Sequence, residues 1–136
     1  MSAKEQFTRK ASRAEALARR RIAEKYLELA DAIAGDSGVG INVCVGNAVL
    51  AGIAAGDAIC IVAHGVYAAG PDHAMAAALL TRIDRSLGGR LQDLVTMKSA
   101  SHYGRTLLTE DGRRRALRAA RILVEHARMR TDFDSG

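Results

Sequence analysis

The most unusual residue in the sequence is Asp57, the only charged residue between positions 41 and 63. A carboxylate among apolar residues must be paired or held in its neutral form, because an isolated charge is very costly to bury. The candidate partners are Lys98, His64 and Tyr103. We predict a buried polar network of Asp57 and His64 that fixes the packing of its helix. One alternative is a functional pocket built around Asp57. Another is that Asp57 lies at the surface or in the interface of a dimer.

Cys60 and His64 are four residues apart, so they would share a helical face as two ligands of a transition metal do. His73 could join them across a turn, but a closed zinc site needs about four ligands and the sequence has no second Cys/His pair. The segment GVGINV at 38–43 lacks the third glycine and the preceding strand of a dinucleotide-binding loop. We therefore predict no metal and no cofactor.

Arginine is concentrated near the end of the chain, with seven arginines in residues 113–130. On a helix, Arg114, Arg118 and Arg121 would present a cationic face, and we predict that they contact nucleic-acid phosphates. The segment has no interleaved aromatic residues, which disfavours a base-stacking platform. The alternative is a solvated face that is partly paired with Glu125 and with acidic residues of the first helix.

The composition limits the elements that can position these residues. The chain has 136 residues and a formal net charge of +5; 49% of its residues are hydrophobic but only 4% are aromatic. Such a length fits one domain, and small aliphatic side chains suit closely packed helices better than a sandwich or barrel. We predict an all-α fold, an up-and-down bundle of four to five helices.

Hydrophobic periodicity and capping signals place the helices. Ser12 with Glu15 predicts a capping box before a helix over residues 13–34, and residues 41–63 are apolar all round, which indicates a buried central helix. A third helix follows Asp72 and breaks at Gly88 and Gly89, a short one runs to about residue 102, and the last begins after residue 109. The predicted core contains Ile53, Ala54, Ile61, Leu79, Leu94, Val95, Leu117 and Val124.

The first helix is expected to bury one apolar face, formed at helical spacing by Ala18, Ile22, Tyr26, Leu29 and Ile33. Gly52 and Gly56, four residues apart, predict a strip on which another helix approaches the central one closely. The predicted organisation is a flexible arm over residues 1–11, one helical domain over 12–130 and a frayed tail over 131–136.

The location of the protein follows from its apolar segment and its cysteines. Residues 41–63 are long enough to span a membrane, but they are rich in Ala and Gly and carry Asp57, so we predict no membrane association. Cys44 and Cys60 would be about 24 Å apart along one helix and cannot form a disulfide. The expected compartment is the cytoplasm.

Four segments in a fixed order carry a resemblance to a known family: GDAICIVAHG, then GPDHAMAAALL, then LQDLVTMKSASHYG, then TEDGRRRALRAARILVEHA. Over roughly residues 12–128 the sequence resembles small prokaryotic HEPN-domain proteins. This resemblance implies a helical bundle that dimerises, is often encoded beside a nucleotidyltransferase in toxin–antitoxin pairs, and in active members is a metal-independent ribonuclease. The family signature is an Arg followed, after four to six residues, by a His.

In this sequence the signature matches only in part. The corresponding place holds Lys98, His102 and Tyr103, with Lys instead of Arg and three residues between Lys98 and His102. Metal-free RNA cleavage needs a base such as His and a cation such as Lys to stabilise the phosphorane, so the parts of a catalytic site are present. Lys lacks the bidentate fork of Arg, which favours loss of activity. Arg121 and His126 match the spacing literally, but they would point away from each other on a helix.

We therefore expect a HEPN-like binding or interaction module without nuclease activity, whose partners are RNA or a nucleotidyltransferase in a toxin–antitoxin or defence setting. The first alternative is a metal-independent ribonuclease that uses Lys98, His102 and Tyr103. The second is a homodimeric structural scaffold whose basic faces bind nothing specific.

Overall fold

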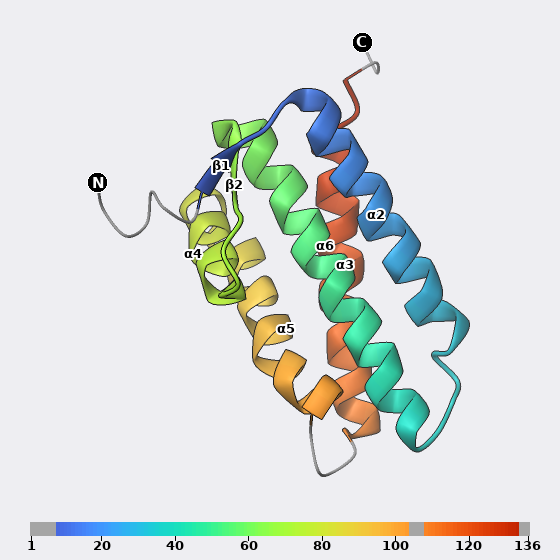
Figure 1. The fold of residues 1–136 in the computed structure, drawn as a ribbon. Helices are drawn as coiled ribbons and strands as arrows, with labels where there is room; N and C mark the ends of the chain where they lie inside the picture. The colour runs from blue at the N-terminus through green and yellow to red at the C-terminus, as the bar shows by residue number, and fades with distance from the viewer. Residues whose placement is uncertain (1–7, 104–107, 134–136) are drawn as a thin grey trace.

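The computed structural model describes residues 8–103 and 108–133, with the side chains of residues 99–103 outside that description. The described residues form an all-α bundle of five helices with one small antiparallel ribbon (Figure 1). The predicted fold class is thus confirmed. The helices are α2 (Arg13–Ala32), α3 (Val39–His64), α4 (His73–Ile83), α5 (Arg85–Tyr103) and α6 (Glu110–Arg130). Figure 1 shows that α2, α3, α5 and α6 alternate in direction, with the short α4 at the edge of the bundle beside the ribbon.

Local signals define where the helices begin. The capping box of α2 is present: the Ser12 hydroxyl accepts from the Glu15 amide at 3.2 Å, and the Glu15 carboxylate accepts from the Ser12 amide at 2.6 Å. Asp72 caps α4 and Thr109 caps α6, as their spacing predicts. At the other end of α3, Gly65 has φ +70°, a left-handed cap conformation that favours glycine.

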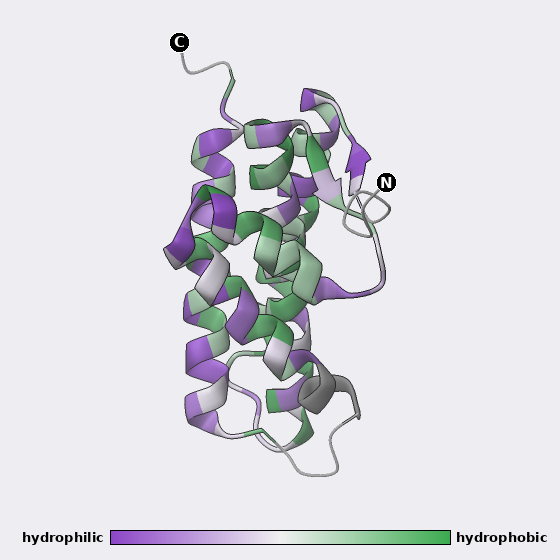
Figure 2. Ribbon diagram, turned by 90° about the vertical axis from the view of Figure 1, so that its left-hand side faces the viewer, coloured by the Kyte–Doolittle hydropathy of each residue, from purple (hydrophilic) through white to green (hydrophobic). Residues whose placement is uncertain are grey.

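The central helix α3 is the core of the bundle. Every residue from Ala51 to Ile61 is buried, and hydropathy colouring shows hydrophobic residues gathered inside the bundle and hydrophilic ones along its outside (Figure 2). The glycine strip works as predicted: side chains of Leu91 and Leu94 from α5 pack over Gly56 and Gly52. Among the described residues, one helix, α3, is long enough and apolar enough to cross a membrane. Most of α3 is buried inside the bundle.

Six of the eight predicted core residues are buried, whereas Leu79 and Val95 are partly buried. On α2 the predicted face is only partly right: Tyr26 and Ile33 pack against the core at partial burial, but the fully buried positions lie elsewhere. The buried residues are Ala16, Ala23 and Ala30, whereas Ile22 and Leu29 are exposed. Three alanines at seven-residue intervals let the α2 backbone approach α3 closely, and this close approach selects the small side chains rather than the large ones.

The predicted break at Gly88 and Gly89 is also wrong. Helix α4 ends at Ile83, and Asp84 separates it from α5, which runs through both glycines. The Asp84 carboxylate accepts a hydrogen bond from the Leu87 amide at 3.0 Å, so Asp84 caps the new helix. Gly88 faces Thr81 so closely that no Cβ would fit, which shows that this glycine serves helix packing.

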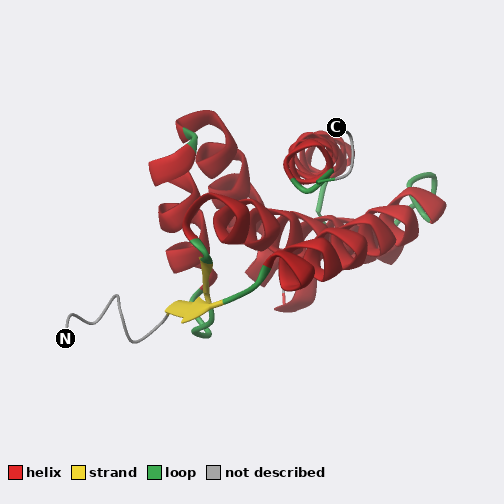
Figure 3. Cartoon of the chain, turned by 90° about the horizontal axis from the view of Figure 1, so that it is seen from above, coloured by secondary structure: helices red, strands yellow, loops and turns green. Residues whose placement is uncertain are grey.

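Both predicted flexible ends are partly ordered. Strand β1 (Thr8–Lys10) pairs with β2 (Val66–Ala68), with Arg9 opposite Tyr67. This ribbon lies at the edge of the bundle, away from α6 (Figure 3). At the other end, Thr131 is buried, and the guanidinium carbon of Arg13 lies 3.9 Å from the centre of the Phe133 ring.

Candidate functional site

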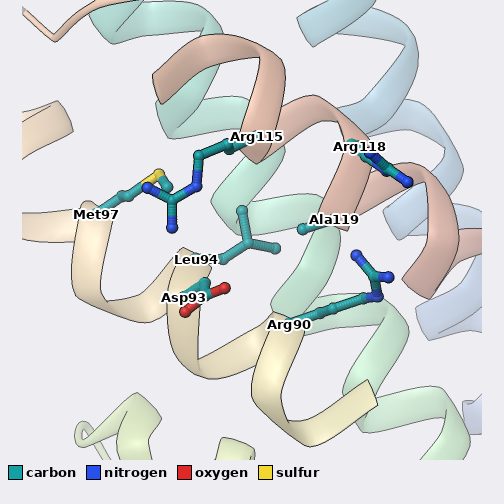
Figure 4. Close-up of a pocket in the computed structure, with 7 residues that line it drawn as sticks. All are labelled: Arg90, Asp93, Leu94, Met97, Arg115, Arg118 and Ala119. Atoms are coloured by element: carbon teal, nitrogen blue, oxygen red, sulfur yellow. The ribbon is translucent and has the colours of Figure 1, made fainter. Parts of the chain in front are cut away.

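A cleft of about 320 Å³ lies between α5 and α6 (Figure 4). Three arginines line it, Arg90 from α5 and Arg115 and Arg118 from α6. We call this feature the arginine cleft. Its remaining lining is apolar except for one carboxylate and consists of Asp93, Leu94, Met97 and Ala119.

Helical spacing explains why the arginines converge. Arg115 and Arg118 are three residues apart, so both extend from the side of α6 that faces α5. Arg90 faces them from one turn before Asp93 on α5. Figure 4 shows the guanidinium groups of Arg90 and Arg118 near one end of the cleft and that of Arg115 toward the Met97 end. The cleft therefore presents donors along its length.

The guanidinium groups of the arginine cleft differ from the other arginines of α6 in their charge partners. Within the described part of the chain, none of them forms an ion pair, although Asp93 lines the same cleft. Four other arginines of α6 are paired, namely Arg113, Arg114, Arg121 and Arg128. Arg128 contacts Glu24 at 2.8 Å and Glu125 at 3.2 Å, as expected for a face paired with Glu125 and with acids of the first helix. An anion bound in the cleft would supply the missing negative charge.

Of the three arginines predicted to contact nucleic acid, the structure places only Arg118 in the cleft. Arg114 pairs with Asp111 on its own helix, and Arg121 pairs with Asp31 of α2 at 2.7 Å. Both pairs are exposed to solvent, and exposed pairs contribute only about 0–1 kcal/mol. Arg114 and Arg121 can therefore exchange these partners for phosphates at little cost.

The run of residues 113–115 has three different environments. Arg113 is buried, with 4% of its surface exposed, and its Nε donates to the Glu110 carboxylate at 3.0 Å. It also donates to the carbonyl of Asp36, which ties α6 to the segment between α2 and α3. Arg114 is exposed and Arg115 lines the cleft. Arg90 and Arg115 were not predicted from the sequence as lining residues; Arg115 could have been found, because it is three residues from Arg118 on the same helix.

Asp57 is buried as predicted, but its partner is a residue that the sequence did not suggest. Arg19 Nη2 of α2 donates to Asp57 Oδ2 at 3.0 Å. Burial raises the pKa of Asp57 to about 6, although the charge and hydrogen bond of Arg19 act in the opposite direction. The predicted partnership with His64 is wrong: His64 is exposed as the last residue of α3, two turns beyond Asp57.

The predicted catalytic residues all belong to α5, which ends at Tyr103. The side chains of His102 and Tyr103 lie outside the described residues. Lys98 is partly buried and lies near the start of α4, where its charge and, more strongly, burial lower the pKa of His73. The structure therefore brings Lys98 toward His73, whose spacing in the sequence suggested only a metal ligand.

Across residues 8–103 and 108–133, no group of three or more His, Cys, Asp or Glu side chains gathers in a metal-binding arrangement. The two thiols are free and buried. Cys44 Sγ donates to the Ala30 carbonyl at 3.3 Å, and burial, with the nearby Asp57 charge, raises the pKa of Cys60 to about 12.

No protein-family model matches the sequence, and no curated protein shows significant similarity to it.

Proposed function

We propose that this protein is a binding module that holds RNA through its phosphates in the arginine cleft. The observation that carries the proposal is the convergence of Arg90, Arg115 and Arg118, from two helices, on one cleft without an ion pair among the described residues. Arginine's planar fork suits phosphate oxygens, and each uncompensated guanidinium gains more from a phosphate than a paired one does.

The composition of the cleft favours phosphates over bases as the bound groups. Among the residues that the structure describes, its lining contains no aromatic side chain on which a base could stack. Asp93 is the one acidic residue of the lining, and it disfavours a tightly packed cluster of phosphates near its own end. Binding through phosphates predicts little dependence on RNA sequence and a strong dependence on salt.

The test is the salt dependence of binding to a short single-stranded oligouridylate, followed by fluorescence anisotropy. Each phosphate neutralised by the protein contributes about 0.7 to the slope of log affinity against log salt for a single strand. Replacing Arg90, Arg115 and Arg118 together by Ala should reduce the slope by about 2. If both proteins bind equally near 1 M salt, the variant binds about 100-fold more weakly near 0.1 M.

The matched control replaces Arg21, Arg82 and Arg130 by Ala. These substitutions remove the same amount of positive charge, but the three residues do not line the cleft. A general charge effect would weaken binding equally in both triple variants and would contradict the proposal. A third variant, with Arg114 and Arg121 replaced by Ala, measures the part of the surface outside the cleft. Circular dichroism melting checks that each variant is folded.

A metal-independent ribonuclease is the alternative from another class, and it requires Lys98 and His102. We propose that cleavage is absent because Lys98 has no bidentate fork and lies only four residues before His102. RNA degradation that persists in excess chelator and disappears with His102→Ala would contradict this. A His102→Ala variant that binds RNA as the wild type does is expected.

The wider setting we propose is a HEPN-like protein of the cytoplasm that acts with a nucleotidyltransferase partner in a toxin–antitoxin or defence system. The all-α bundle supports this at the level of fold class. Co-purification of the chain with a nucleotidyltransferase encoded beside it would test the partnership, and a nucleotidyltransferase that elutes separately from it would contradict it.

A homodimeric scaffold is the second candidate, and exposed apolar side chains favour it. Leu29 is 48% exposed and shares a face of α2 with Ile22, and Val39 and Val43 are exposed one turn apart at the start of α3. Light scattering should give a dimer for the wild type and a monomer for Leu29→Glu combined with Val43→Glu. A monomeric wild type would contradict the scaffold.

A further inference from the structure

A second pocket, of about 440 Å³, lies around Asp57 and shares no lining residue with the arginine cleft. Residues from α2, α3, the start of α4 and both strands of the ribbon line it. We call it the Asp57 pocket. Its volume falls within the range of sites that bind small organic molecules.

Two guanidinium groups face this pocket. Arg19 is held by its hydrogen bond to Asp57, and its side chain is 34% exposed whereas that of Asp57 is 8% exposed. The buried Asp57 carboxylate therefore holds the Arg19 guanidinium in place through Nη2. Among the described residues, the other N–H groups of this guanidinium remain to donate to a ligand. Arg9 is the second cation. It lies directly opposite Tyr67 on the antiparallel ribbon, and both residues line the pocket.

The remaining lining defines the body of the ligand. Ile53 and Ile61 of α3 and Ala18 of α2 form apolar walls. His73 adds a polar group whose pKa is lowered by burial and by Lys98, so it is neutral near pH 7 and can donate or accept one hydrogen bond. A molecule with an apolar body and a single charged end matches this arrangement.

The charge balance of the pocket selects the number of ligand charges. Arg9 and Arg19 are opposed by Asp57 and by Glu15, whose carboxylate also accepts from the Ser12 amide. A monoanion can face the two guanidinium groups while Asp57 and Glu15 stay on their protein donors. The four charged side chains sum to zero, so a monoanion adds one uncompensated negative charge, whereas a dianion such as a phosphate monoester adds two and is disfavoured.

We propose that the Asp57 pocket binds a small monocarboxylate, with its carboxylate on Arg19 and Arg9 and its apolar body against Ile53 and Ile61. Arginine pairs with a planar carboxylate through two parallel hydrogen bonds, which fixes the orientation of the ligand. This proposal is independent of RNA binding, because the two sites use different residues.

The experiment is an amide NMR titration of the full chain with butyrate, hexanoate and phenylacetate. At least one of them should shift the amides of the β1–β2 ribbon and of α3 around Asp57. Phenylacetamide, the neutral analogue of phenylacetate, should bind at least about tenfold more weakly, and phenyl phosphate should bind more weakly as well. Shifts confined to α5 and α6, equal binding of the amide, stronger binding of phenyl phosphate, or no shift with any carboxylate would overturn the proposal.

Variants of the ribbon separate recognition from folding. Arg9 is exposed, so Arg9→Gln should leave the fold intact and reduce the affinity for the carboxylate about tenfold. Lys10→Gln, on the same strand and outside the pocket lining, should bind as the wild type does. Arg19→Lys keeps the charge but loses the fork, and it should weaken binding of the carboxylate more than that of the amide. Equal affinities of the Arg9 and Lys10 variants would contradict the assignment.

Discussion

Arg19 Nη2 lies 3.0 Å from Asp57 Oδ2, and this contact joins α2 to α3 across 38 residues of sequence. The contact is asymmetric, because the carboxylate is buried and the guanidinium is partly in solvent. The loss of hydration at Asp57 outweighs the attraction of Arg19, so the pKa of this carboxyl is raised from 3.8 to about 6.

The raised pKa predicts how the stability of the fold changes with pH. Asp57 favours folding fully below about pH 3.8, and this contribution is lost as the pH rises through about 6. Asp57→Asn stays neutral, so the variant should gain stability relative to the wild type between about pH 4 and pH 7, by at most about 3 kcal/mol. Urea unfolding of both proteins at several pH values measures this difference. A difference that does not change with pH would show that Asp57 is hydrated.

Two adjacent glycines of α5 should respond oppositely to the same substitution. A Cβ at Gly88 would collide with the backbone and side chain of Thr81, so Gly88→Ala should destabilise the fold by about 1–3 kcal/mol or more. Nothing lies within 4 Å of a Cβ at Gly89, so Gly89→Ala should stabilise it by up to about 1 kcal/mol, the difference in helix propensity. Denaturant midpoints of the two variants check this. Equal effects would mean that α4 and α5 are not in close contact at Gly88.

The two thiols should be almost unreactive in the folded protein. Cys44 and Cys60 are 0% and 2% exposed, and burial raises both pKa values, so little thiolate is accessible. A chromogenic disulfide reagent should react with them at least about 100-fold more slowly than with the unfolded chain. An Ala32→Cys variant, at an exposed position of α2, provides a reactive control. Rapid reaction of the wild type would indicate that α3 opens readily.

The acidic residue of the arginine cleft should oppose RNA binding. Asp93→Asn removes one negative charge beside the three guanidinium groups, so affinity for the oligouridylate should rise about two- to fivefold, the size of an exposed charge interaction. Glu28→Gln on α2 is the matched control outside the cleft. If both substitutions raise the affinity equally, the effect comes from net charge and does not locate the RNA.

The sequence predicted the helices that depend on local signals. The capping box at Ser12, the caps at Asp72 and Thr109, and the buried course of α3 follow from residue types at short spacing. The face of α2 could not be predicted in this way, because its alanines are buried only where α3 comes close. Two adjacent glycines such as Gly88 and Gly89 usually indicate the end of a helix. Here Gly88 instead allows the close approach of Thr81.

The candidate sites depend on contacts between distant segments, which the sequence does not specify. Arg19 belongs to a run of three arginines typical of a solvated face, and only the packing of α2 on α3 places it beside Asp57. Arg90 and Arg118 are on different helices and meet only when α5 packs on α6. His64 has the right chemistry to pair with Asp57, but the length of α3 leaves it in solvent.

The position of α3 in the chain has a consequence for synthesis on the ribosome. The leucines that cover Gly52 and Gly56 belong to helices translated after α3. At roughly 5–20 residues per second, the ribosome takes about 3–13 s to proceed from the end of α3 at His64 to the end of α6 at Arg130. During that interval the most apolar helix can pack only on α2 and on the helices already made, and chaperones that bind apolar helices compete with folding. The yield of the protein in a cell therefore depends on how quickly its last helix is completed.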